Sequence, residues 1–96
     1  MPARRTAITD GRETLLQFPC RFPIKVMGES HPELFTAVQA CIARHVPDRE
    51  SVEITQRESR AGNYVGVTIT LTATSQAQLD ALYRDLGLCS RVRMVL

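Results

Sequence analysis

Long apolar runs are missing from this sequence. No run approaches the roughly 18 residues that a membrane-spanning helix requires, and the polar first 12 residues lack the apolar stretch of a secretory signal. We therefore expect neither a membrane partner nor export. The 96 residues suffice for a single domain, and a composition of 44% apolar and 23% charged residues is typical of a globular chain.

Cysteine is scarce, and its spacing carries no motif. Cys20, Cys41 and Cys89 lie far apart, without a C-x-x-C pair, and an odd number of cysteines does not close a disulfide framework. A zinc site takes about four nitrogen or sulfur ligands at close spacing, which these thiols together with His31 and His45 do not offer. We expect no metal site and no cofactor. Free thiols without an export signal predict a cytoplasmic protein.

The excess of positive charge is small. The 12 basic and 10 acidic residues leave a net charge of +2, and this excess lies entirely within the first 21 residues. A nucleic-acid binder normally gathers its basic residues on one face, so the balance predicts no nucleic-acid partner. Residues 1–17 form a polar segment without clear periodicity, which we interpret as a flexible N-terminal arm, followed by one domain over residues 18–96.

Periodic apolar positions predict the elements of that domain. Alternation predicts four strands, at residues 22–27, 52–57, 64–73 and 92–96. Helical spacing predicts two helices, one between Gly28 and Pro47 and one that ends just before Gly87. Both helices start with capping-box spacing, and the boxes are Ser30 with Glu33 and Ser75 with Gln78. Gly62 and Asn63 predict the turn of a hairpin between the second and third strands.

The resulting order β-α-β-β-α-β predicts an α+β fold. Each strand has one apolar face and each helix one apolar stripe, and two layers bury both. We expect a ferredoxin-like two-layer sandwich, with a four-stranded antiparallel sheet and both helices on one face. Right-handed crossovers place the first and third strands in the centre.

In this arrangement the second face of the sheet is open, and it discriminates between functions that share the fold. RNA-recognition domains stack bases on aromatic residues of the central strands, whereas none of the positions expected on the open face is aromatic. Those positions are Pro23, Lys25, Met27, Glu53, Thr55, Arg57, Gly66, Thr68, Thr70, Thr72, Arg91, Arg93 and Val95.

The loop between the first strand and the first helix excludes two further functions. It has neither the two cysteines of a copper chaperone nor the arginine with which an acylphosphatase holds an acyl phosphate. Ser30 and His31 are adjacent, so their side chains diverge and do not form a nucleophile–base pair. We therefore expect no enzymatic activity. Ser30 is the expected helix cap, and His31 is either a solvated first-turn residue or a polar contact to a ligand or partner.

Two features of the open face allow different interpretations. Lys25, Arg91 and Arg93 form a small basic patch, which either contacts an anion or is neutralised by Glu53 and solvent. The threonines of the third strand either reflect the ordinary strand propensity of threonine on a wet face or form a surface that packs against a second sheet.

Several strings resemble the YbeD-like proteins, a bacterial family of unknown function. They are Phe18-Pro19, Phe22-Pro23-Ile24-Lys25-Val26-Met27-Gly28, Pro32-Glu33-Leu34, Gly62-Asn63-Tyr64, Leu82-Tyr83 with Leu86-Gly87, and Val92-Arg93-Met94-Val95-Leu96. The resemblance implies a ferredoxin-like fold similar to ACT-type regulatory domains, which bind small ligands, often amino acids, near the first strand–helix loop and pair through their sheets. The genes of this family's members often lie near lipoate-attachment genes, so the resemblance also hints at a lipoate-related context. The arginine-bearing arm, Cys20 and Cys41 depart from the family pattern.

Two hypotheses follow. In the first, the protein is a non-enzymatic regulatory domain that binds a small anionic metabolite or amino acid, and the binding residues are Gly28, Glu29, Ser30 and His31, with support from Lys25 and Arg93. Backbone N–H groups at a helix start suit an anionic group.

In the second hypothesis, the protein is an interaction module whose open face docks a partner protein or a second copy as a homodimer, through Thr68, Thr70 and Arg91.

Overall fold

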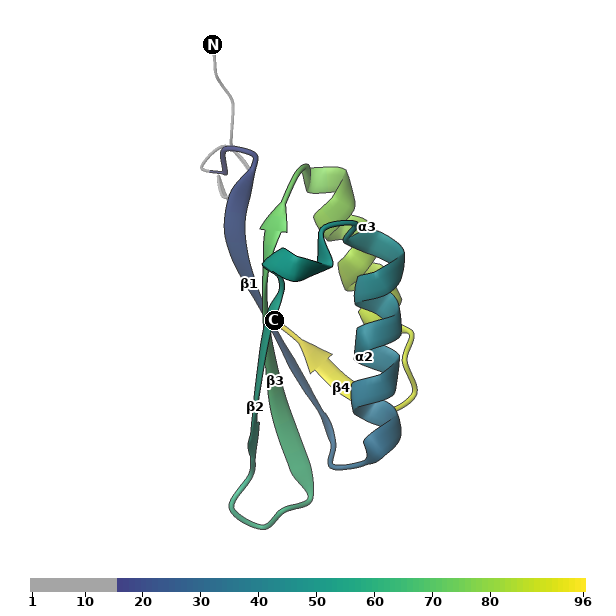
Figure 1. The fold of residues 1–96 in the computed structure, drawn as a ribbon. Helices are drawn as coiled ribbons and strands as arrows, with labels where there is room; N and C mark the ends of the chain where they lie inside the picture. Colours follow the sequence, from purple (N-terminus) through teal and green to yellow (C-terminus); the bar gives the residue numbers. More distant parts are fainter. Residues whose placement is uncertain (1–15) are drawn as a thin grey trace, which may run out of the picture.

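The computed structural model describes residues 16–96 and confirms the predicted fold (Figure 1). Most of the arm expected over residues 1–17 lies outside the described residues. The elements, in chain order, are β1 (Cys20–Glu29), α2 (Pro32–His45), the short 3-10 helix η1 (Arg49–Ser51), β2 (Glu53–Glu58), β3 (Tyr64–Ala73), α3 (Gln76–Gly87) and β4 (Val92–Val95).

The four strands form one antiparallel sheet in the order β2-β3-β1-β4. β1 and β3 are central, as the crossover rule predicts, and they pair along ten residues from Cys20↔Ala73 to Glu29↔Tyr64. Figure 1 shows α2 and α3 on the same side of this sheet, which leaves its other face open.

The core lies between the sheet and the helices. Alternate residues of the two central strands point toward the helices, and both helices point an apolar stripe back at them. The largest fully buried side chains are Ile24, Val26, Leu34, Val38, Cys41, Val46, Val67, Ile69, Leu71, Leu79, Leu82 and Leu86. Burial of each such aliphatic side chain is worth about 1.5–3 kcal/mol, so this layer holds the sheet in place beneath the open face.

The start of α2 differs from the prediction. β1 continues to Glu29, two residues beyond the predicted strand 22–27, and the helix cap is His31, whose Nδ1 accepts a hydrogen bond from the backbone N–H of Glu33 at 3.0 Å. The prediction that Ser30 caps α2 was therefore wrong by one residue. In α3 the predicted cap is confirmed, because the Ser75 hydroxyl oxygen accepts from the Gln78 N–H at 3.0 Å.

The two predicted glycine positions have different outcomes. Gly62 has a φ of +80° in the turn between β2 and β3, as the turn chemistry predicts. Gly87, expected just beyond α3, lies inside the helix, and the following Leu88 keeps right-handed backbone angles of φ −86° and ψ −9°. The helix thus ends without a left-handed glycine.

The orientation of β4 corrects a second prediction. Val95 pairs with Val26 and Met94 with Met27, but Gly28 pairs with Val92, so Arg93 is an extra residue in a β-bulge. An extra residue reverses which face the residues on one side of it occupy. Val92 and Val95 both pack against the core, whereas Met94 lies on the open face. The placement of Val95 outward and of Met94 and Leu96 inward was wrong.

Candidate functional site

The first strand–helix loop is held tightly to β4 and to the hairpin. The backbone N–H of Glu29 donates to the carbonyl of Arg91, and that of Ser30 donates to the carbonyl of Asn63, each at 3.0 Å. Gly28 is buried, and a Cβ atom there would lie 2.7 Å from the Arg91 carbonyl oxygen and 2.7 Å from a methyl carbon of Leu34. The absence of a side chain at Gly28 therefore lets the backbone of β1 pack closely against Arg91 and Leu34.

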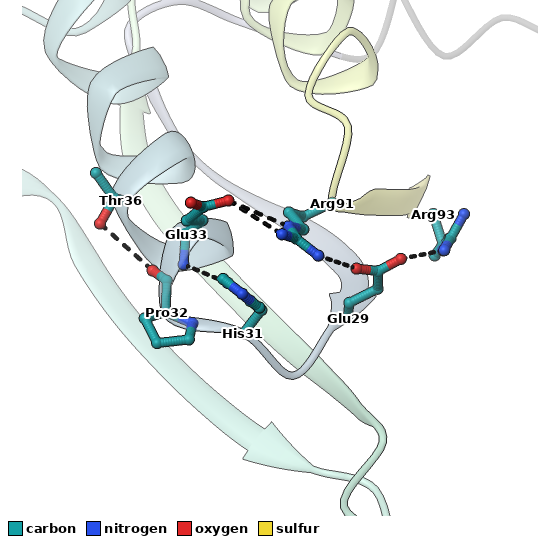
Figure 2. Close-up of polar contacts among 7 residues, drawn as sticks. All are labelled: Glu29, His31, Pro32, Glu33, Thr36, Arg91 and Arg93. Atoms are coloured by element: carbon teal, nitrogen blue, oxygen red, sulfur yellow. Dashed lines mark hydrogen bonds and ion pairs between the residues drawn. The ribbon is translucent and has the colours of Figure 1, made fainter.

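Four charged side chains meet beside this loop (Figure 2), and we refer to Glu29, Glu33, Arg91 and Arg93 as the loop cluster. Arg91 Nη1 donates to Glu29 Oε1 at 2.8 Å and Arg91 Nη2 donates to Glu33 Oε1 at 3.1 Å. Arg93 donates to the other oxygen of Glu29. One arginine thus ties the end of β1 to the first turn of α2.

The loop cluster neutralises its own charge. The hydrogen bond from Arg91, together with the charge of Arg93, lowers the pKa of Glu29 below its ordinary value of 4.5, against an opposing contribution from burial. The same hydrogen bonds from Arg91 to Glu29 and Glu33 raise the pKa of Arg91. The lowered pKa favours the ionised form of Glu29 beside the two guanidinium groups. One interpretation of the basic patch had Glu53 neutralise it. In the structure, Glu29 and Glu33 instead pair with Arg91 and Arg93.

Three backbone donors near the start of α2 already have acceptors. Ser30 N–H donates to Asn63, Glu33 N–H to the His31 ring, and Leu34 N–H to the His31 carbonyl at 3.0 Å, while Pro32 has no N–H. The Ser30 hydroxyl donates to Glu58 Oε2 at 3.1 Å. An anion that bound to any of these three N–H groups would have to displace the present acceptor. The predicted ligand role of Gly28, Glu29, Ser30 and His31 stays a prediction.

The predicted supporting residues do not all gather at the loop. Arg93 reaches Glu29, and Arg91 turns toward Glu29 and Glu33 from a position just before β4. Lys25 instead lies in the middle of the open face, opposite Thr68 on β3, and exchanges backbone hydrogen bonds with Leu96 at 3.1 and 2.7 Å.

The open face combines exposed apolar groups with cations. The register places Met94, Met27, Gly66 and Arg57 in one row across the four strands, and Leu96, Lys25, Thr68 and Thr55 in the next. Met27 is 41% exposed, Met94 53% and Leu96 62%. Within residues 16–96, neither Lys25 nor Arg57 forms an ion pair.

Tyr64 also lies on the open face, in register with Glu29, and is 48% exposed. The expectation that the face carries no aromatic residue was therefore wrong at this end of β3, two residues before Gly66, the first position considered on that strand. Thr68 and Thr70 are half-buried on the same face, as predicted. The signal that could have found Tyr64 is its even spacing from Gly66 and Thr68.

A second polar cluster lies at the far end of α2, where sequence reasoning saw none. Asp85 Oδ2 accepts from Arg44 Nε at 2.8 Å and lies 2.9 Å from His45 Nε2. These two contacts, with that to Arg44 the stronger, lower the pKa of Asp85. Cys41 and Cys89 meet beside this cluster, with 3.6 Å between their sulfur atoms.

Metal-ligating groups and membrane-spanning helices are both absent from the described residues. Over residues 16–96, no three His, Cys, Asp or Glu side chains come together in a group that could hold a metal ion. None of the helices in the same part of the chain has the length and apolar character to cross a membrane.

Solved structures define the class of this domain. The ACT domain from the GTP pyrophosphokinase of Chlorobium tepidum superposes with a TM-score of 0.60 at 14% identity, covering 79% of this chain and 94% of that one. A solution structure of a protein from H. pylori superposes with a TM-score of 0.68 at 7% identity, covering 96% and 98% of the two chains. At these identities the likeness concerns the fold alone: the chain has a ferredoxin-like fold that is similar to the fold of an ACT domain.

Sequence comparison then gives the family. The family model described as "Protein of unknown function (DUF493)" matches residues 13–96, and the chain belongs to this family. The UPF0250 protein of Chromobacterium violaceum is 42% identical over 89 residues, which cover 93% of this chain and 100% of the relative. The UPF0250 protein of Leptothrix cholodnii is 46% identical over 84 residues, covering 88% and 92%. The resemblance to the YbeD-like proteins is thereby confirmed.

Proposed function

We propose that this protein is a small, non-enzymatic regulatory domain that docks through its open sheet face onto an acidic surface of a partner protein. The observation that carries the proposal is the pairing of cations with apolar side chains on that face: Lys25 and Arg57 lie in adjacent rows beside Met27 and Leu96. The sequence offers no nucleophile–base pair, which is why the proposal is a binding role.

The face contains a hollow in which a partner side chain can insert. Gly66 forms part of its floor, and Met27, Tyr64, Arg57 and Lys25 stand around it, enclosing about 850 Å³. A Cβ atom on Gly66 would touch the sulfur of Met27 at 3.4 Å, so the absence of a side chain there leaves this part of the hollow open. Protein interfaces characteristically place apolar contacts at the centre, with arginine and aromatic residues enriched.

Charge selects the occupant of this face. In a two-fold dimer the same patch meets itself, so Lys25 and Arg57 of one copy would approach the same cations of the other. Like charges brought together in an interface disfavour the complex, whereas opposite charges steer association and set its register. An acidic partner surface therefore fits this face better than a second copy.

A second candidate is ligand binding beside the first loop. A groove of about 600 Å³ lies between the start of α2 and the β2–β3 hairpin, with Leu34, Phe35 and Val65 on its apolar side and Ser30, His31 and Glu58 on its polar side. The ACT-like fold supports this alternative. Because the backbone N–H groups of Ser30, Glu33 and Leu34 have acceptors, the Ser30 and His31 side chains would contribute to binding a metabolite in this groove.

Site-specific photo-crosslinking tests the docking proposal in the native cell. A benzophenone amino acid in place of Thr68, on the open face, is expected to give a discrete crosslink to one protein with an acidic surface. The matched control carries the same group at Ala40, on the exposed side of α2, and is expected to give none. Equal crosslinking from both positions, or a Thr68 crosslink to a second copy of this chain, would overturn the acidic-partner proposal.

An NMR titration tests the second candidate. Lipoic acid and the standard amino acids are added separately at millimolar concentration, and amide shifts are followed. Binding in the groove moves the amides of Ser30 and His31 while leaving Thr68 in place. Unchanged amide positions from residue 25 to residue 34 would exclude ligand binding at the loop for these compounds.

A further inference from the structure

Two cysteines that are 48 residues apart in the chain meet in the fold. Cys41 is fully buried on the core side of α2, and Cys89 lies half-buried between the end of α3 and β4. Their Sγ atoms are 3.6 Å apart, in van der Waals contact, and both cysteines are free thiols. Cys20, at the start of β1, is the third free thiol of the chain.

We propose that Cys41 and Cys89 form a reversible intramolecular disulfide, with a hydroperoxide as the oxidant. A disulfide bond is about 2.05 Å long, so the sulfur atoms must approach by about 1.5 Å. Cys89 lies in irregular backbone between two elements, and rotation of its side chain can supply this movement. Cys41 is fixed in the middle of α2. The site is a redox modification site and stands independently of the docking proposal.

The two thiols have different roles in the reaction. Burial, reinforced by the hydrogen bond with Cys89, raises the pKa of the Cys41 thiol to about 12, so Cys41 reacts second. The Cys89 thiolate attacks one peroxide oxygen, an S–O bond forms, and the O–O bond breaks with release of hydroxide. This hydroxide and the proton lost from Cys89 together make the first water. Cys89 is then a sulfenic acid.

The second step closes the bridge. The sulfur of Cys41 attacks the sulfur of the Cys89 sulfenic acid, so the S–S bond forms and the S–O bond breaks. The leaving hydroxide combines with the proton of Cys41 as the second water. Overall, two thiols and one hydroperoxide give one disulfide and two oxygen-bearing products, water and either a second water or the alcohol of an organic peroxide.

Two charged groups beside the pair act on the Cys41 thiol in opposite directions: the charge of Asp85 raises its pKa, and the charge of Arg44 lowers it. Arg44 Nη2 lies 3.5 Å from Cys41 Sγ, which places positive charge beside the sulfur as it loses its proton. Asp85 holds Arg44 by the 2.8 Å ion pair and also contacts His45, and its backbone carbonyl accepts from the Cys89 thiol at 3.6 Å. The guanidinium that supports the thiolate is therefore positioned by the residue beside Cys89.

Mass spectrometry of the oxidised full chain tests the proposal. One equivalent of hydrogen peroxide is expected to lower the intact mass by about 2 Da, the loss of two hydrogen atoms, and to leave one free thiol. Peptide mapping should join the peptides of Cys41 and Cys89, and dithiothreitol should restore all thiols. The Cys20→Ser variant, which keeps both members of the pair, should behave as wild type.

Single variants test the order of the steps. Cys41→Ser should accumulate a Cys89 sulfenic acid that dimedone captures, whereas Cys89→Ser should give no early adduct at Cys41. The wild-type map does not depend on whether these variants fold. A wild-type product bridged through Cys20, or stepwise gains of about 16 Da per oxygen without a bridge, would overturn the proposal.

Discussion

The carbonyl oxygen of Arg91 lies 2.7 Å from the point that a Cβ atom on Gly28 would occupy. Gly28 is thus the position at which β1 approaches the start of β4 and the first turn of α2 most closely. The Glu29 N–H donates to the same Arg91 carbonyl. The geometry of the loop cluster therefore depends on the absence of a side chain at Gly28.

Gly28→Ala should destabilise the protein. The new methyl group would meet backbone at one side and Leu34 at the other, and such overpacking costs about 1–3 kcal/mol. Chemical denaturation followed by circular dichroism measures the loss. The control is Gly87→Ala, where a Cβ meets nothing within 4 Å and helix propensity predicts a gain of up to about 1 kcal/mol. Equal stability of the two variants would contradict the close packing at Gly28.

His31→Ala should cost more stability than Ser30→Ala. The His31 ring caps the Glu33 N–H, and loss of a side-chain cap costs about 1 kcal/mol. Ser30→Ala removes only an exposed hydrogen bond to Glu58. Paired urea unfolding curves measure the difference, and the reverse order would restore Ser30 as the cap.

The fold was predictable because it follows from periodicity. Each helix and each strand buries one face. The buried faces show in the sequence as helical spacing of apolar residues in the helices and as alternation in the strands. A shift of one residue in the cap at Ser30 and His31 does not change the architecture. It does change the candidate site, because the His31 ring is engaged as the cap and the Ser30 hydroxyl instead donates to Glu58.

Other features depend on contacts that no local pattern records. The bulge at Arg93 exchanges the faces of Met94 and Val95, although the alternation of the sequence continues unchanged through it. The approach of Cys41 to Cys89 depends on how α2 packs beside the end of α3. Neither relation is visible before the chain folds, so the place of Met94 and Leu96 on the open face and the thiol pair were both missed.

Truncation of β4 side chains tests the bulge. Val95 packs against the core, so Val95→Ala should cost about 1 kcal/mol or more. Met94 is 53% exposed, and Met94→Ala should change the free energy of unfolding by less than about 0.5 kcal/mol. Thermal unfolding of both variants measures this, and a larger cost at Met94 would support the uninterrupted alternation instead.

The contribution of Glu29 to stability should depend on pH. Its pKa is lowered in the folded chain, with the hydrogen bond from Arg91 as the largest cause. A carboxyl group with a lowered folded pKa stabilises the fold above its unfolded pKa, and this contribution is lost as pH falls through the folded value. Wild type should therefore be more stable than Glu29→Gln at pH 7, and the difference should shrink at pH values well below 4.5.

Denaturation at a series of pH values follows this difference. The matched control is Glu50→Gln, since Glu50 is exposed and has no ion pair among residues 16–96. Its difference from wild type should change less with pH than that of Glu29→Gln. A gap between wild type and Glu29→Gln that stays constant from pH 7 to pH 3 would show that the loop cluster does not hold Glu29 ionised.

Charge reversal on the open face tests the central claim most directly. The double variant Lys25→Glu with Arg57→Glu should abolish the crosslink from position 68, because it opposes an acidic partner with acidic side chains. The double variant Arg49→Glu with Arg84→Glu makes the same change in net charge on exposed residues of η1 and α3, and it should leave the crosslink in place. Loss of the crosslink in both variants, or in neither, would contradict docking through the cations of the open face.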